Sequence, residues 1–274
     1  MVISNNNTIP VKMMIYLVIF CSTSLVLFAS PVDFRNHHFG INPGVSVEFS
    51  RDEKASPLMY KGRDFPFQVF YSYEGSKNRH HLDLIYKHYE PISSVGNKAD
   101  FFRGELRYSY LNLNRKIYHD KVNIYTGIVW SNSFFARWYN YYSFVKEGPF
   151  GELYSSFSPS FFGEHKLSES KRIIYKISSP IFAYAIRSGY SFSEPNGIID
   201  KDHSTITDMD ILKSGTFLTV NKFRGLTALV TYQEAVSNHL TFSVGYKFNY
   251  YQYPSGLLNL SANHQVYFSL SWMI

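Results

Sequence analysis

The sequence predicts an all-β fold, an antiparallel transmembrane β-barrel of about twelve strands. Three observations indicate it. The N-terminus has the pattern of a secretory signal, the aromatic content is high, and apolar residues recur at every second position along many segments. We expect a signal peptide at residues 1–30 and a single barrel domain at residues 31–274.

The predicted signal peptide has a basic start, an apolar centre and a small-residue exit. Lys12 is its only charge, apolar runs cover 13–20 and 25–29, and Pro31 follows the small residues. A helical membrane anchor is the alternative, but residues 21–24 interrupt the run and no basic stop-transfer cluster follows. The only cysteine, Cys21, would leave with the signal. The barrel would then hold no disulfide, thiolate metal site or cysteine nucleophile.

The composition of the whole chain favours a membrane barrel over other classes. Phe, Tyr and Trp make up 18% of the residues, yet the mean hydropathy is slightly polar at −0.18. Membrane barrels place aromatic rings at both lipid–water boundaries. No later segment has the run of about 20 apolar residues that a membrane helix needs. The net charge of +6 is scattered, and nucleic-acid binding would need a clustered basic face.

Alternation with a period of two is clearest in residues 101–112. Leu106 lies on the apolar face of this segment, whereas Arg103, Glu105 and Arg107 lie on the other. A soluble β-sandwich also alternates, but its strands are usually about 5–6 residues long. The segments here are nearer the roughly 9–11 residues that cross a bilayer at a tilt. Similar alternation runs through residues 65–74, 121–131 and 240–251.

The pattern fixes the type of the elements more closely than their number, and eight, ten or fourteen strands are alternatives to twelve. Pro180 interrupts one long segment and cannot donate to a strand ladder. An even number places both termini in the periplasm, with 75–80 as a periplasmic turn and with 51–64 and 90–100 outside. The long connection 192–214 then falls in the periplasm, where loops are normally short, unless the count is wrong by one. The predicted strands are 40–50, 65–74, 81–89, 101–112, 120–131, 134–145, 150–159, 171–190, 215–223, 226–235, 239–252 and 264–274.

The last strand carries a resemblance to a known class of proteins. Val266, Phe268, Leu270 and Trp272 alternate up to the C-terminus, which is Ile274. In this the chain resembles bacterial outer-membrane β-barrel proteins, although these usually end on an aromatic residue. The resemblance covers residues 31–274 and implies contact with outer-membrane lipid and lipopolysaccharide. It also implies insertion by the barrel-assembly machinery, which reads the last strand. It implies no particular oligomeric state.

A set of charged residues falls on the polar faces of the predicted strands, and we expect it to face the lumen. Charges of both signs in a confined interior need partners. Two interpretations stay open: a rigid hydrogen-bonded interior, or a charged constriction in a narrow pore for small solutes. The set is Glu48, Glu74, Asp83, Lys87, Arg103, Glu105, Arg107, Lys121, Arg187 and Lys247.

No motif of a soluble enzyme occurs, so the protein is expected to be non-enzymatic and without a cofactor. The chain lacks G-x-S-x-G, G-x-G-x-x-G, P-loop and H-E-x-x-H patterns. Asp200, Asp202 and Asp208 match three positions of a calcium loop. However, Thr205 replaces the required glycine and Ile211 the required glutamate, which leaves a weak cation site at most.

Two other functions remain as alternatives. One is a lipid-modifying hydrolase of the outer leaflet, which needs a nucleophile and a base in contact. The other is a secretion or assembly accessory, for which only segment 192–214 could offer a partner surface. The hydrolase candidates near strand ends are His88, His239 and His264 with Ser237 and Ser261, together with the adjacent His203 and Ser204.

Overall fold

The computed structural model describes residues 37–53, 56–118, 121–141, 145–187, 215–253 and 258–274. The predicted signal peptide at 1–30 and the acidic segment with Asp200, Asp202 and Asp208 lie outside these residues. None of the described residues forms a helix long and apolar enough to cross a membrane. The strands are β1 (His37–Asp52), β2 (Ser56–Asp64), β3 (Phe67–Glu74), β4 (Asn78–Tyr89), β5 (Ile92–Ser93), β6 (Ala99–Ile117), β7 (Val122–Tyr141), β8 (Val145–Lys166), β9 (Lys171–Ser178), β10 (Phe182–Arg187), β11 (Thr216–Thr219), β12 (Arg224–Ala235), β13 (Leu240–Tyr253) and β14 (Asn259–Met273).

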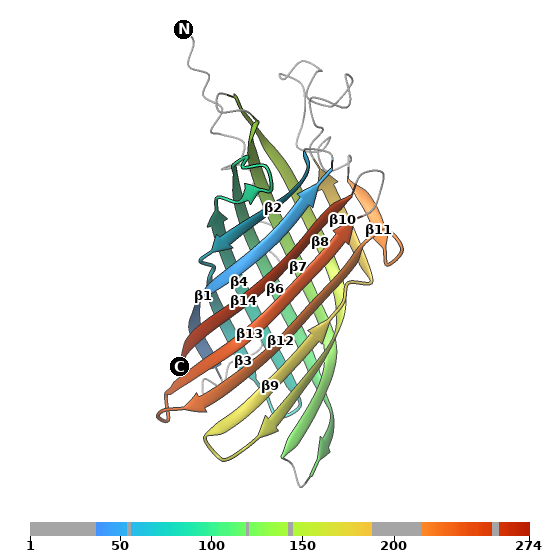
Figure 1. The fold of residues 1–274 in the computed structure, drawn as a ribbon. Coiled ribbons are helices and arrows are strands. Elements are labelled where there is room, and N and C mark those ends of the chain that lie inside the picture. The colour runs from blue at the N-terminus through green and yellow to red at the C-terminus, as the bar shows by residue number, and fades with distance from the viewer. Residues whose placement is uncertain (1–36, 54–55, 119–120, 142–144, 188–214, 254–257) are drawn as a thin grey trace. The chain divides into compact units, whose positions relative to one another are not determined.

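These strands form a closed antiparallel barrel with ten strand positions (Figure 1). Neighbours in the ring follow one another in the chain, and β1 pairs with β14 to join the two ends. Three positions are each built from two strands in series. The strands β2 and β3 both pair with β1, β9 and β10 both pair with β8, and β11 and β12 lie against β10 and β9.

The antiparallel barrel is confirmed, and its strand number is ten, one of the alternatives to the expected twelve. The predicted strands 120–131 and 134–145 are one strand, β7. The predicted strand 171–190 is broken around Pro180 into β9 and β10, since proline cannot continue the ladder. Residues 56–64, expected in a loop, form β2.

The single strand β7 lowers by one the number of strands that precede segment 192–214, and the segment itself lies outside the described residues. The barrel termini share one rim, because His38 pairs with Met273. At this terminal rim the connections are short, as in residues 75–77, 167–170 and 236–239. The strand β10 ends and β11 begins at the opposite rim, which we call the distal rim.

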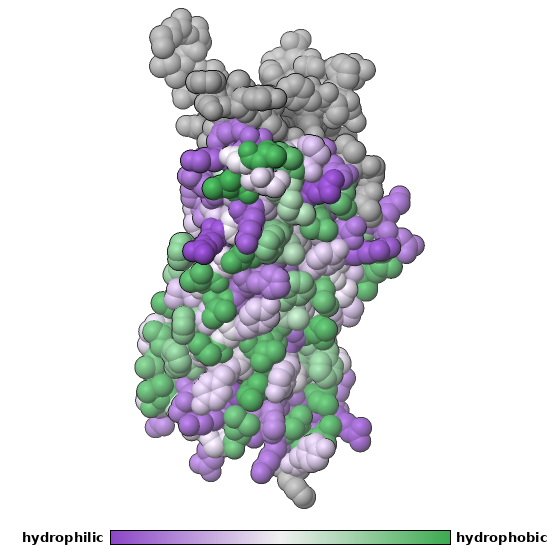
Figure 2. Space-filling view, viewed as in Figure 1, coloured by the Kyte–Doolittle hydropathy of each residue, from purple (hydrophilic) through white to green (hydrophobic). Residues whose placement is uncertain are grey.

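The two faces of the wall differ as a membrane barrel requires. Exposed apolar side chains such as Leu84, Phe157, Phe242 and Phe268 point outward, while their sequence neighbours are buried in the lumen. Apolar residues cover much of the middle and lower part of the face shown in Figure 2, and hydrophilic residues gather at the lower rim. The buried core of this fold is therefore its lumen.

A glycine in β7 allows close approach to β6. A Cβ atom at Gly127 would overlap the carbonyl oxygen of Tyr110 and lie 2.8 Å from the Cα of Leu111. We expect Gly127→Ala to lower the free energy of unfolding by about 1–3 kcal/mol, because the backbone must shift to make room. Urea titration of the protein in lipid vesicles measures this change.

The control is Gly104→Ala, where a Cβ atom would meet nothing within 4 Å. It should leave stability unchanged or slightly raised. Equal unfolding midpoints for the two variants would show that β6 and β7 are not packed this closely.

Candidate functional site

A four-residue ion network crosses the lumen near the terminal rim. Arg172 of β9 lies across the ring from Glu74 of β3, and its Nη1 is 3.1 Å from Glu74 Oε2. The same Nη1 is 2.6 Å from Glu164 Oε1 of β8. Arg79 of β4 completes the network, with Nη2 at 2.8 Å from Glu164 Oε2. Two arginines therefore balance two carboxylates, and their contacts connect four different strands.

A second network crosses the lumen toward the distal rim. Arg137 of β7 places Nη1 at 2.8 Å from Glu152 Oε2 and at 3.3 Å from Asp52 Oδ2. Its Nη2 donates a hydrogen bond to the Tyr251 hydroxyl at 3.1 Å. Asn259 Nδ2 donates to Glu152 Oε1 at 3.0 Å. Arg137, Glu152, Asp52 and Asn259 are each at most 2% exposed, so this network is sealed from water.

Aromatic clusters surround the second network. Tyr60, Tyr89, Phe101 and Tyr139 pack together in the lumen, and the Phe101 and Tyr139 rings are 5.4 Å apart. The Arg137 guanidinium also lies 5.2 Å from the centre of the Phe135 ring. Rings of this size fill the space between the strands, so this end of the lumen holds packed side chains.

A lysine lies between two carboxylates in a third group. Lys87 Nζ is 3.7 Å from Glu48 Oε2 and 3.6 Å from Asp64 Oδ2. The Ser261 hydroxyl donates to Glu48 Oε1 at 3.0 Å. All four residues are buried.

At mid-barrel, Glu105 of β6 bridges two arginines of the same strand. Arg103 Nη2 donates to Glu105 Oε2 at 2.9 Å, and Arg107 Nη2 pairs with Glu105 Oε1. Residues two apart on a strand share a face, which is why the three side chains meet inside the lumen. Asp83 lies nearby, where it accepts a hydrogen bond from Gln68 Nε2 at 2.5 Å and contacts His81 Nε2 at 2.8 Å.

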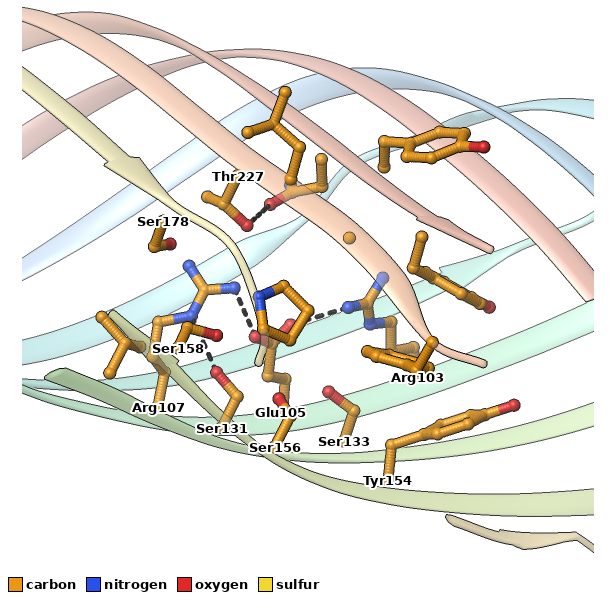
Figure 3. A pocket seen from close by; sticks show the side chains of 18 of the residues that line it. Arg103, Glu105, Arg107, Ser131, Ser133, Tyr154, Ser156, Ser158, Ser178 and Thr227 are labelled. Carbon is orange, nitrogen blue, oxygen red and sulfur yellow. Dashed lines mark hydrogen bonds and ion pairs between the residues drawn. The ribbon is translucent and has the colours of Figure 1, made fainter. Parts of the chain in front are cut away.

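A cavity of about 80 Å³ opens beside this Arg–Glu–Arg group (Figure 3). Its far wall is formed by inward positions of β7 and β8, where serines lie between Val129, Phe135 and Tyr154. Ser131 lies directly across from Ser156 in the ladder, and both face the cavity. Arg107 Nε is 3.4 Å from the Ser131 hydroxyl. The serines that line the cavity are Ser131, Ser133, Ser156, Ser158 and Ser178.

Eight of the ten residues that were predicted to face the lumen have side chains in the interior, and Lys121 and Arg187 are the other two. Lys121 lies in the turn before β7, where it is exposed and its N–H donates to the Tyr118 carbonyl, because the strand begins two residues later than the predicted start at residue 120. Arg187 belongs to β10 through its pairing with Glu152, and its side chain is not described. The residues with side chains in the interior groups are Glu48, Glu74, Asp83, Lys87, Arg103, Glu105 and Arg107, and Lys247 is 5% exposed on the inner face of β13.

Several interior charges were missed by the sequence reasoning. Arg172 and Lys176 alternate with Ile173, Tyr175 and Ile177, so a period of two along this segment would have placed both charges on the inner face. Arg79 precedes the predicted start of its strand. Arg137 and Glu152 lie in segments whose strands were divided wrongly.

The histidines that the structure describes do not form the serine pair that a hydrolase needs. His88 Nε2 is 2.8 Å from Asp100 Oδ1 on the outer face, and His264 Nδ1 is 2.6 Å from the Tyr246 hydroxyl. Ser261 points into the lumen, on the face opposite to His264. Within the described residues, no serine hydroxyl is hydrogen-bonded to a histidine ring, and no group of three or more His, Cys, Asp or Glu could hold a metal ion. His203 and Ser204 lie outside these residues.

Comparison with solved structures identifies the fold. The chain is similar to the outer membrane protease OmpT from Escherichia coli, with a TM-score of 0.53 and 8% identity over 90% of this chain and 99% of that one. The fold is that of a bacterial outer-membrane β-barrel. Two further outer-membrane barrels align less closely. The translocator domain of NalP from Neisseria meningitidis has a TM-score of 0.42 and 7% identity over 97% and 99% of the chains. Neisserial surface protein A has a TM-score of 0.36 and 13% identity over 86% and 97%.

No protein-family model matches this outer-membrane barrel, and no curated protein does. At 8% identity the likeness to OmpT shows the fold alone.

Proposed function

We propose that the protein is a non-enzymatic barrel of the bacterial outer membrane whose lumen is closed to ions at rest. The observation that carries this proposal is the network in which Arg172 joins Glu74 and Glu164 across the lumen. The sealed network around Arg137 supports it at the other end. A conducting pore needs a continuous column of water, and both networks occupy that path.

The proposed orientation follows from the connections. Short turns of outer-membrane barrels lie in the periplasm and longer loops lie outside. The terminal rim would therefore face the periplasm, and the distal rim would face the exterior. Lipid and lipopolysaccharide would surround the apolar outer face.

Planar-bilayer recording tests the closed lumen. We expect the purified, refolded protein to give no conductance steps in potassium chloride. A double variant, Arg172→Ala with Arg137→Ala, removes the central arginine of each network and should give small, transient conductance steps. Regular steps from the unmodified protein, with a size that grows with salt concentration, would replace this proposal with that of a narrow pore.

A further inference from the structure

Among the interior groups formed by described residues, the serine-lined cavity lies beside the one in which basic side chains outnumber carboxylates. The network near the terminal rim is balanced, and the groups around Arg137 and Lys87 each hold two carboxylates for one cation. The mid-barrel group holds four basic side chains and two carboxylates, and it adjoins the Lys87 group, because Glu48 lies close enough to act on Arg103. Its members are Arg103, Arg107, Lys176 and Lys247 against Glu105 and Asp83. Buried charge of one sign is costly, so a bound anion at this level would stabilise the interior.

Several hydrogen-bond donors of this group have no partner among the described residues. Arg103 Nε has no hydrogen-bond partner, although it is buried. Lys247 makes no ion pair within 4.0 Å among the described residues, and Lys176 donates to the Ser109 hydroxyl at 2.8 Å. In the described part of the chain, the hydroxyls of four cavity serines have no hydrogen-bond partner either: Ser133, Ser156, Ser158 and Ser178.

We propose that this cavity binds a small oxyanion, a phosphate or a carboxylate group, between the two arginines of β6 and the serines of β7 and β8. Guanidinium groups and hydroxyls are the donors that hold such oxygens, and charge-assisted hydrogen bonds are the stronger ones. A volume of about 80 Å³ has room for several water molecules or an oxyanion of similar size. The proposal rests on the closed lumen, because an open channel would screen the arginines with water.

The wall beside the cavity offers a path to the membrane. The wall strands β9–β10 and β11–β12 are both interrupted at this level, around Pro180 and at residues 220–223. The cavity is lined there by Pro180 and Gly225, and also by Leu226 and Tyr250. Leu226 and Tyr250 are cross-strand partners whose side chains alternate with inward ones, so they belong to the outer face. An oxyanion at the head of a lipid could therefore sit in the cavity with its chain directed outward.

Isothermal titration calorimetry on the refolded protein in non-ionic micelles tests the site with two probes, inorganic phosphate and dodecyl phosphate. We expect binding of at least one probe. Arg107→Gln should weaken it by about tenfold or more, since it removes a charged donor. Ser156→Leu fills the cavity and should abolish binding without touching the ion network. The control Arg63→Gln removes a basic residue from the outer face of β2 and should bind like the unmodified protein.

The two probes distinguish the sources of the oxyanion. Equal affinities indicate a free anion, and much tighter binding of dodecyl phosphate indicates a lipid headgroup. Folding of each variant is checked by its β-sheet circular dichroism, and if Arg107→Gln fails to fold, Ser156→Leu decides. No heat of binding from either probe, or binding that survives Ser156→Leu, would overturn the proposal. Conductance is recorded on the same samples, so an open lumen and an empty cavity are told apart.

Discussion

Arg137→Met is expected to lower the free energy of unfolding of the barrel by about 3–5 kcal/mol. The substitution keeps most of the side-chain volume but removes the guanidinium that lies 2.8 Å from Glu152 and 3.3 Å from Asp52. Both carboxylates are at most 2% exposed, so water cannot replace the lost partner. Urea-induced unfolding in phospholipid vesicles, followed by tryptophan fluorescence, gives the change in stability.

Two further variants separate lost charge balance from lost packing. The triple variant Arg137→Met, Asp52→Asn, Glu152→Gln removes the whole charged group and should recover much of the stability, because no charge is left buried alone. Arg51→Met removes an arginine whose ion pair with Glu53 is partly exposed, and it should cost less than about 1 kcal/mol. If Arg137→Met unfolds at the same urea concentration as Arg51→Met, the network contributes little to stability. The proposal of a closed lumen then loses its support at the distal rim.

The alternation of β6 could be predicted from the sequence because the two faces of this strand meet different surroundings. Leu106 and its neighbours on one face are apolar, and Arg103, Glu105 and Arg107 on the other are charged. Burial follows the same period, with Glu105, Arg107 and Ser109 all at most 9% exposed. A strand with one face toward lipid and one toward a polar interior shows its period directly in the residue types.

The ends of the longest strands could not be predicted, because the two faces of a strand differ in residue type only where they meet different surroundings. The strands β7 and β8 have 20 and 22 residues, about twice the length that crosses a bilayer. Where both faces accept polar residues, the period fades, as at Asn132 and Ser133 in the middle of β7. These two residues fall between the predicted strands 120–131 and 134–145. The strand β2 was missed because Lys61 and Arg63 occupy its outer face.

The candidate site was visible only in part. The three charges of β6 are two residues apart and could be grouped from one strand. The partnership of Glu74 with Arg172 joins residues 98 positions apart and depends on which strands face each other across the ring. The excess of positive charge at mid-barrel likewise appears only when β6, β9 and β13 are placed together.

Leu106→Arg is expected to prevent or strongly impair folding into lipid bilayers. Leu106 lies on the outer face of β6 across from Leu84 of β4, which is 55% exposed. An arginine on the lipid-facing side near mid-membrane costs about 2–4 kcal/mol. That is a large share of the roughly 5–15 kcal/mol by which ordinary domains are stable. Refolding from urea into phosphatidylcholine vesicles of increasing thickness measures the loss, and the folded fraction should fall most in the thickest bilayers.

The matched control is Leu167→Arg, which makes the same substitution in the turn between β8 and β9. Leu167 is 50% exposed at the terminal rim, where a new charge can reach water. This variant should fold as efficiently as the unmodified protein in every bilayer. Equal folding of Leu106→Arg and Leu167→Arg in thick bilayers would mean that the outer face of β6 does not meet hydrocarbon. The apolar outer surface would then need another explanation, and a soluble β-protein with an exposed polar face would replace the membrane barrel.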